Sequence, residues 1–166
     1  MTDKSSDEIL VLYGSQTGNA QAIAEKLNER LLQENFNVTL KVLNQYDKLS
    51  APITEQQLVA MICSTTGSGD APDNASRFLR YVKKRAHPKD LLCNMRLALL
   101  GLGDTNYSAF CQPSKVIHRR CVALGATMLL PLGELLEHAA ACPCRRNQHH
   151  RGKPIEDGYI PLSVNS

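Results

Sequence analysis

A glycine-rich loop with hydroxyl side chains, GSQTGNAQ at residues 14–21, directly follows an apolar run over residues 9–13. It lacks the lysine of the G-x-x-x-x-G-K-[ST] loop that binds nucleoside triphosphates, and its spacing does not match G-x-G-x-x-G. Its hydroxyl groups, together with backbone N–H groups at the start of a predicted helix, suit a small dianion. The loop therefore indicates a monophosphate site without a cation; the alternative is a capped turn that binds no ligand.

Two further polar loops also follow apolar runs: STTGSGDAPDNA at residues 64–75, and the end of GLGDTNYSAFC at residues 101–111. The glycines and small hydroxyl side chains of the first would let its backbone approach a flat ligand. The second carries Tyr107 and Phe110, which have little core to reach from a loop. We expect Tyr107 to stack on a planar heterocycle, and Phe110 either to do the same or to anchor the loop from beneath.

The elements that position these loops alternate along the chain. Apolar runs at residues 9–13, 58–63, 97–103 and 126–132, with an alternating segment at 36–43, predict five strands, the alternating one at an edge. Helical spacing predicts helices over 20–33, with Asn19 as cap, from about 75 onward, and over 113–124. Strands and helices in this order predict an α/β fold with a parallel sheet covered on both faces. All three polar loops follow carboxyl ends of strands, so they should share one edge of the sheet.

The composition is that of one soluble domain: 166 residues, 43% of them hydrophobic, with a net charge of +3. This length suits a single core. No apolar run approaches the roughly 20 residues of a membrane span. The N-terminus, MTDKSSDEI, is neither a secretory signal nor a transit peptide. We therefore expect a cytoplasmic monomer that does not bind membranes.

Two other features have a structural and a functional interpretation. The basic segment RFLRYVKKRAHPK at residues 77–89 could bind nucleic acid. We interpret it as the solvated face of a helix whose Phe78, Leu79 and Val82 point inward, and we expect no nucleic-acid partner. The six cysteines lack paired spacings, so we expect reduced thiols. The first four should be small core-filling residues: Cys63, Cys93, Cys111 and Cys121.

Three segments, GSQTGNAQAIAEKL, CSTTGSGDAPDNASRF and LALLGLGDTNYSAFC, together resemble the flavodoxin-like FMN domain of the diflavin reductases. The resemblance covers about residues 8–133, with the motifs in order and at the expected spacing. It implies a flavodoxin-like, doubly wound, five-stranded parallel sheet in the order 2-1-3-4-5. It also implies FMN as the cofactor, which has both a monophosphate and a planar ring.

By this resemblance, the phosphate would lie on the first loop and the isoalloxazine ring between the other two. A peptide of the second loop would hydrogen-bond the flavin N5 in a redox-dependent way. A cation nearby would favour the anionic reduced flavin and raise its potential, so its absence keeps the flavin an electron donor. The implied cofactor-binding residues are Ser15, Gln16, Thr17, Gly18, Asn19 and Ala20 for the phosphate, Thr65, Thr66, Gly67 and Ser68 beside the ring, and Leu102, Gly103, Asp104, Tyr107, Phe110 and Cys111 to complete the ring site. No residue is assigned a catalytic role.

Within the family, two branches fit the loops. The threonine pair Thr65–Thr66, the LLGLGD segment and the cysteine after Phe110 most resemble the branch that passes electrons from NADPH through FAD and FMN to the cob(II)alamin of methionine synthase. HRR at 118–120 instead favours the branch that serves cytosolic iron–sulfur assembly. The resemblance thus implies an oxidoreductase whose partner is methionine synthase or another redox acceptor protein. FAD and NADPH would bind only in a full-length parent.

After Gly133 the resemblance ends. We assign residues 1–133 to the flavodoxin-like domain, and residues 134–166 to a divergent, mostly disordered tail that could hold a short helix at 134–142. The last helix of the fold would then be missing or replaced. Because this uncovers aliphatic side chains, we expect weak FMN retention and a low melting temperature. The tail's cysteines and histidines (Cys142, Cys144, His149 and His150) lack zinc-site spacings, so we expect no metal.

The sequence holds no region for FAD or NADPH. We therefore expect it to relay electrons but not to take hydride from NADPH by itself. An alternative of another class is a flavin-poor fragment that competes for the partner protein, which the divergent tail would favour.

Overall fold

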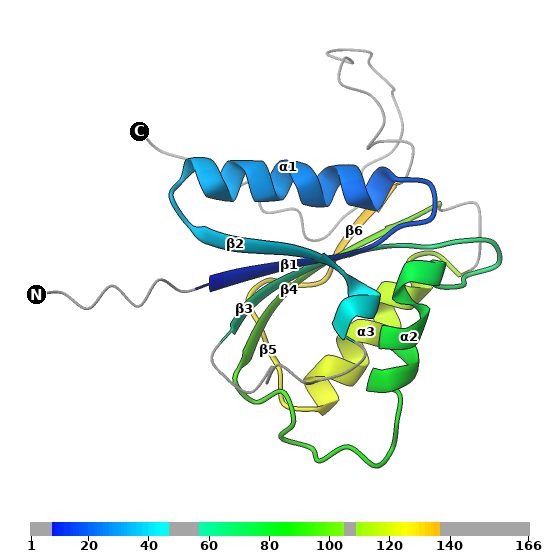
Figure 1. The fold of residues 1–166 in the computed structure, drawn as a ribbon. Coiled ribbons are helices and arrows are strands. Elements are labelled where there is room, and N and C mark those ends of the chain that lie inside the picture. Colours follow the sequence, from blue (N-terminus) through cyan, green and yellow to red (C-terminus); the bar gives the residue numbers. More distant parts are fainter. Residues whose placement is uncertain (1–7, 47–56, 105–108, 137–166) are drawn as a thin grey trace, which may run out of the picture.

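The computed structural model describes residues 8–46, 57–104 and 109–136. Its centre is a parallel sheet in the strand order β2-β1-β3-β4-β5, which confirms the predicted fold (Figure 1). A further strand, β6, pairs in parallel with the second half of β4, on the side where β5 pairs with its first half. The strands are β1 (Glu8–Gly14), β2 (Asn37–Val42), β3 (Gln57–Ser64), β4 (Met95–Gly103), β5 (Thr127–Met128) and β6 (Gly133–Leu136).

The three central strands set the edge at which the loops emerge. β1, β3 and β4 are continuous apolar runs because both of their faces pack against other elements or side chains. Their register pairs Val11 with Ala60 and Ala60 with Ala98. The strands therefore end together, at Gly14, Ser64 and Gly103. β2 lies at one edge of the sheet, as its alternating sequence predicts.

The helices cover the two faces unequally. α1 (Asn19–Gln33) lies on one face, where Ala20 and Ala24 pack against Val11 and Ile62. On the other face lie α2 (Asp73–Val82), α3 (Gln112–Ala123) and the short 3-10 helix η1 (Leu43–Tyr46). The predicted inward side of α2 is confirmed, because Phe78, Leu79 and Val82 are all buried. In the part of the chain that the structure describes, no helix is long and apolar enough to cross a membrane.

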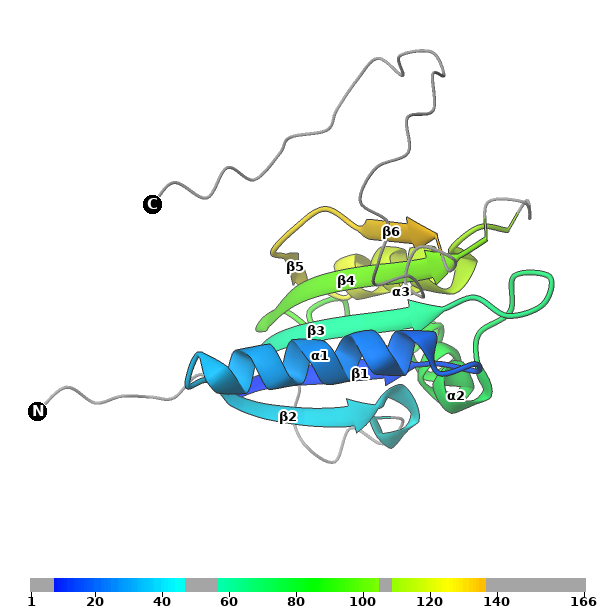
Figure 2. The ribbon, with the colours of Figure 1, turned by 90° about the horizontal axis from the view of Figure 1, so that it is seen from above.

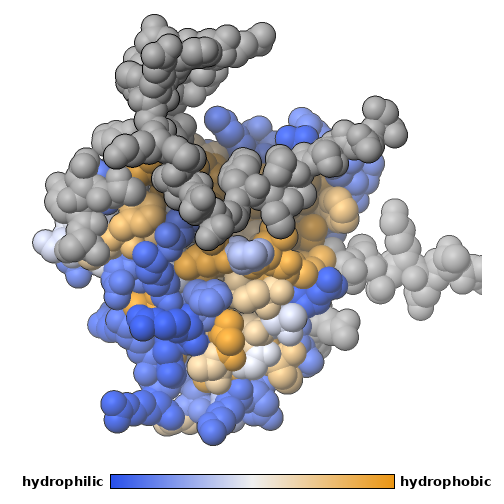
Figure 3. Space-filling model, turned by 180° about the vertical axis from the view of Figure 1, so that it is seen from behind, coloured by the Kyte–Doolittle hydropathy of each residue, from blue (hydrophilic) through white to orange (hydrophobic). Residues whose placement is uncertain are grey.

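On the α1 face, the described helices do not reach across the whole sheet. Figure 2 shows α1 over β1 and β3, with β4 and β6 beside it. Leu100 and Leu135 are only half-buried there. Figure 3, which views the β5–β6 side, shows hydrophobic side chains gathered on it. The prediction that the last helix is missing or replaced concerns residues outside the described ones and stays a prediction, as does weak FMN retention.

The strands that follow α3, β5 and β6, differ from two predictions. The fifth strand, predicted over 126–132, pairs only at Thr127–Met128, and the chain rejoins β4 at Gly133. Pro131, which has no N–H to donate, lies in the interruption. The short helix predicted over 134–142 is wrong for residues 134–136, since the edge of β4 offers backbone partners that a strand can use. Residues 137–142 lie outside the described part, and the domain boundary predicted after Gly133 falls inside β6.

Two smaller predictions are also wrong. Cys63, Cys111 and Cys121 are buried free thiols, but Cys93 is exposed, because it lies in the turns before β4 rather than within an element. The cap of α1 is not Asn19, which is already helical, but Gly18, whose φ of 93° suits glycine.

Candidate cofactor site

The first loop presents backbone N–H groups at the start of α1. Gly18 caps the helix with a left-handed backbone, and its own N–H donates to Ser15 Oγ at 3.0 Å. The first hydrogen bond of the helix is donated by the N–H of Ala22 to Gly18 O, at 2.9 Å. The N–H groups of the first turn precede this bond and have no acceptor within the helix. No side chain caps them among the described residues. This turn can therefore bind an anion through N–H groups and the helix dipole.

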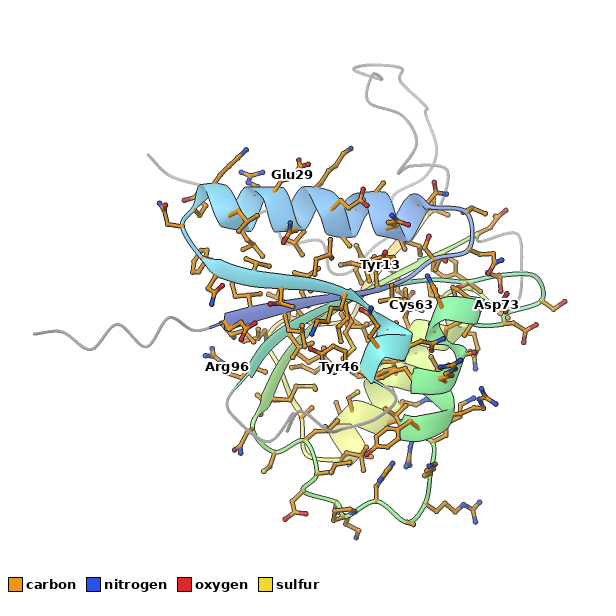
Figure 4. All side chains as sticks on the ribbon, in the orientation of Figure 1. Tyr13, Glu29, Tyr46, Cys63, Asp73 and Arg96 are labelled. Atoms are coloured by element: carbon orange, nitrogen blue, oxygen red, sulfur yellow. The ribbon has the colours of Figure 1, made fainter. Side chains whose placement is uncertain are left out.

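The start of α2 braces the same loop from the other side. The N–H of Ser15 donates to Asn74 Oδ1 at 2.9 Å, and the N–H of Asp73 donates to Gln16 Oε1 at 3.3 Å. Figure 4 shows Asp73 at the start of α2, at the edge where the loops gather. The Gln16 side chain thus accepts a hydrogen bond from α2, although the resemblance assigns it to the phosphate. Asp73 and Asn74 are not among the site residues predicted from the sequence. The signal that could have indicated them is an acidic and an amide side chain at the start of a predicted helix.

The second loop is a tight turn closed on itself. Thr66 N–H donates to Asp70 O at 2.9 Å, and Asp70 N–H donates back to Thr66 O at 2.8 Å. Positive φ angles of 48° at Gly67 and 114° at Gly69 make this turn possible. Within the described part of the chain, the N–H groups of Gly67 and Ser68 donate to no acceptor. They are exposed and available to a ligand at this edge.

The described part of the third loop folds back onto the end of β4. A Cβ placed on Gly103 would lie 3.0 Å from the Phe110 ring and 2.9 Å from the Cys111 nitrogen. Phe110 is half-buried, so it anchors the loop and still presents part of its ring. Tyr107 lies outside the described residues, and its stacking role stays a prediction. Leu102 and Cys111 are fully buried beneath the loop, so their ring contacts also stay predictions.

Direct contacts join the loops to one another. Thr65 Oγ1 donates to Leu102 O at 2.9 Å, linking the second loop to β4. A Cβ on Gly69 would overlap the Cβ of Ala109, so the second and third loops touch where a larger residue does not fit. With the bonds from Ser15 and Gln16 to α2, the three predicted loops form one continuous rim. The structure thus brings together the described members of the predicted set.

Near this rim, one lysine is paired with an acidic side chain and one buried thiol is inert. Lys115 Nζ lies 5.3 Å from the centre of the Phe110 ring, but it pairs with Glu134 at 3.2 Å, which offsets its charge. Cys63 lies in β3, where it pairs with Gly14 at the end of β1, and burial, with the nearby Cys111, raises the pKa of its thiol to about 12. Among the described residues, no three His, Cys, Asp or Glu side chains gather as metal ligands do.

The sequence profile of the flavodoxin family matches residues 11–143. The chain belongs to the flavodoxin family. Flavodoxin domains bind FMN, so the predicted cofactor is confirmed at the level of the family. The described residues fit that cofactor: the first turn of α1 has open N–H groups for a monophosphate, and the turn at Gly67 and Ser68 has open N–H groups for a ring edge.

Solved flavodoxins share the fold. Oxidised Flavodoxin 2 from Bacillus cereus superposes with a TM-score of 0.64 at 24% identity, covering 78% of this chain and 84% of that one. A mutant flavodoxin from Pseudomonas aeruginosa gives a TM-score of 0.66 at 23% identity, covering 82% and 88%. At these identities the likeness shows the fold alone.

Curated relatives are diflavin reductases of two kinds, which match this flavodoxin domain at 39–42% and at 37–40% identity. It is 40% identical over 129 residues to NADPH-dependent diflavin oxidoreductase 1 of Danio rerio, covering 78% of this chain and 21% of the relative. It is also 40% identical over 133 residues to methionine synthase reductase of Bos taurus, covering 80% and 18%. The chain thus spans about a fifth of the length of the curated relatives it matches.

Proposed function

We propose that this chain is the FMN-binding electron-transfer module of a diflavin reductase of the methionine synthase reductase type. In a full-length parent it would receive electrons that originate from NADPH and pass through FAD. It would deliver them to the cob(II)alamin of methionine synthase in the cytoplasm. The single observation that carries the proposal is the rim of three hydrogen-bonded loops at the carboxyl ends of β1, β3 and β4, with open N–H groups on two of them.

Different residues of the rim would bind the phosphate and the ring of the cofactor. The first turn of α1 would hold the phosphate, with the hydroxyl of Ser15 keeping Gly18 in its left-handed conformation. The turn from Thr66 to Asp70 would set the edge of the ring through the N–H groups of Gly67 and Ser68. Bound FMN supplies one-electron chemistry, and the protein supplies binding, orientation and electrostatics. The half-exposed rim would let an acceptor protein approach.

The choice between the two branches depends on a few residues. The threonine pair Thr65–Thr66 supports the methionine synthase branch. The HRR segment, which favours the iron–sulfur branch, has a structural use here, because the guanidinium of Arg120 donates to the carbonyls of Val82 and Lys84 at 2.8 and 3.1 Å. Because Arg120 has this structural role, the HRR segment alone does not favour the alternative over the methionine synthase branch. The ordered rim likewise favours a redox module over a flavin-poor competitor.

FMN titration tests the proposal through a pair of matched glycine variants. Gly18 and Gly125 have positive φ angles of 93° and 97°, so alanine should cost each backbone a similar amount, about 1–2 kcal/mol. Gly18 caps α1 in the site, where a Cβ would meet nothing within 4 Å. Gly125 follows α3, and a Cβ there would also lie 3.2–3.3 Å from backbone atoms of Cys93 and Lys89, so the control variant should lose at least as much stability. We expect Gly18→Ala to raise the FMN dissociation constant about tenfold and Gly125→Ala to leave it unchanged. If neither variant binds FMN more weakly than the parent, the assigned phosphate loop is wrong.

The acceptor is tested with the full-length parent. Reactivation of oxidised methionine synthase should depend on the parent protein and on NADPH. If the parent binds FMN but does not support reactivation, the proposed partner is wrong while the cofactor assignment stands.

A further inference from the structure

Positive charge is concentrated on the α2–α3 side of the sheet. α3 carries three basic residues and no acidic one, and α2 continues at its C-terminus into Lys83, Lys84 and Arg85. α1, on the other face, balances two glutamates against one lysine and one arginine. The charge of the domain is therefore asymmetric.

A groove of about 310 Å³ runs between α2 and α3 on this side. Ala71, Leu79, Pro113 and Val116 form its apolar lining. Two cations, Arg80 and Lys83, also line it, and Asp70 lies at the end nearest the second loop. Arg80 also lines a neighbouring hollow of about 350 Å³ with Arg77, Tyr81 and Lys84. We call the first of these hollows the α2–α3 groove.

Arg80 and Lys83 differ from other basic residues on this side of the sheet that make contacts within the domain. Arg120 caps the end of α2, Lys115 pairs with Glu134, and Lys84 lies 5.5 Å from the ring centre of Tyr81. Arg80 and Lys83 are exposed, and within the described part of the chain neither pairs with an acidic side chain. The stability of the domain does not require two cations without acidic partners beside an apolar hollow.

We propose that the α2–α3 groove docks an acidic protein segment, in which an apolar side chain enters the groove and flanking carboxylates pair with Arg80 and Lys83. The groove has the elements of a protein interface: an apolar centre and charged groups at the margin. Charges placed in this way steer a partner of opposite charge and fix its register. The binding itself does not depend on FMN.

The chemistry of the groove favours a protein over a nucleic acid. Single strands bind to grooves with exposed aromatic rings on which bases stack. Tyr81 is the aromatic side chain in this region, and its ring already lies 4.4 Å from the His87 ring, tilted by 45°, with Lys84 over it. The groove itself is lined by aliphatic side chains and proline rather than by rings. A leucine-sized side chain suits it better than a base.

The position of the groove connects it to the cofactor rim. Gly69 and Asp70, which line its near end, belong to the turn that starts at Thr66. A segment docked here would therefore lie beside the second loop. If the proposed function holds, this face orients the acceptor or another domain of the parent toward the FMN; only this consequence depends on that function.

The test uses a fluorescein-labelled peptide with a central leucine flanked by glutamates, and a second peptide in which serine replaces the leucine. Binding is followed by fluorescence anisotropy at low and at physiological salt. The variant Arg80→Gln/Lys83→Gln removes the two groove cations. The matched control, Lys26→Gln/Arg30→Gln, removes one lysine and one arginine from the exposed side of α1. FMN titration of each variant shows whether the cofactor site is intact.

We expect the groove variant to bind the leucine peptide about tenfold more weakly. The α1 variant should bind like the parent, the serine peptide should bind more weakly than the leucine peptide, and FMN affinity should not change. Equal losses in the two variants would mean binding by net charge alone and would overturn the proposal. So would tighter binding of an oligothymidylate of equal charge, or no peptide binding by the parent at low salt. Failure of FMN binding in all proteins, with peptide binding retained, would reject the proposed function and leave the groove proposal standing.

Discussion

Replacing Gly14 with alanine should damage the stability of the domain and its affinity for FMN together. Gly14 ends β1, and a Cβ there would lie 2.6 Å from the Cβ of Ala75, 3.1 Å from Leu43 Cδ1 and 3.3 Å from Cys63 Sγ. The contact with Ala75 cannot be relieved by a side-chain rotation, because both atoms are fixed to the backbone. The start of α2 must therefore move away from β1. The start of α2 also contains Asn74, whose Oδ1 accepts a hydrogen bond from the Ser15 N–H, and Asp73, whose N–H donates to the Gln16 side chain.

The cost can be worked out from these contacts. Overpacking a core site by one methyl group costs about 1–3 kcal/mol. Weakening the two hydrogen bonds adds about 0.5–1.5 kcal/mol if they loosen without breaking. We therefore expect a loss of about 2–4 kcal/mol from a stability of about 5–15 kcal/mol. At about 4 °C per kcal/mol, the melting temperature should fall by roughly 8–16 °C.

Thermal unfolding by circular dichroism and FMN fluorescence quenching measure the two effects. Gly133→Ala is the matched control: it also lies in a strand, but the close contact of its Cβ, at 3.0 Å, would be with the flexible end of Leu100, and the backbone atoms of Leu99 and Leu100 would lie at 3.6 and 4.0 Å. The double variant Gly14→Ala/Ala75→Gly should recover most of the loss, less about 1 kcal/mol for glycine in a helix. If the two single effects simply add in the double variant, the contact between these positions does not limit the loop, and the reasoning fails.

Two other predictions concern the support of the site and its buried thiols. Asn74→Ala removes the acceptor of the Ser15 N–H, a part-buried bond of 2.9 Å, and should weaken FMN binding about fivefold (~1 kcal/mol) in fluorescence titration; unchanged affinity would show that α2 does not brace the loop. Burial raises the pKa of Cys63 and Cys121 from 9.0 to about 12. Because the unfolded thiols ionise first, the free energy of unfolding should fall as the pH rises from about 9 to 12, and urea titrations across this range measure it. Exposed Cys93 should react with a thiol reagent in the native state, and the three buried thiols, Cys63, Cys111 and Cys121, should not.

The sequence predicts the sheet and the position of the rim because both follow from simple patterns. Apolar runs at the spacing of parallel strands place the three polar loops at one edge, whatever the details of each loop. The helix at 134–136 fails for the opposite reason: Leu135 and Leu136 suit a helix or a strand equally, and the unpaired edge of β4 decides between them. Local sequence does not contain that information.

The finer structure of the site depends on tertiary contacts that no motif encodes. Gln16 is exposed and polar within a phosphate loop, so the resemblance assigns it to the ligand, but the start of α2 lies close enough to donate to it. Cys93 lies among apolar neighbours in the sequence, yet the turn before β4 exposes it. In both cases the position of a distant segment determines what the side chain contacts.

The two ends of α2 would serve different tasks, and this separates the proposals experimentally. Its first turn holds the phosphate loop through Asp73 and Asn74, so changes there should alter FMN affinity and stability together. Its last turn carries Arg80 and leads into Lys83, which neither pack in the core nor hydrogen-bond the rim, so changes there should alter partner binding alone. Since α2 is a short, rigid helix buried through Phe78 and Val82, a partner docked at one end cannot shift the other without disturbing the core. We therefore expect peptide binding in the groove to leave the FMN dissociation constant unchanged, and the α2–α3 face to orient an acceptor without tuning the cofactor.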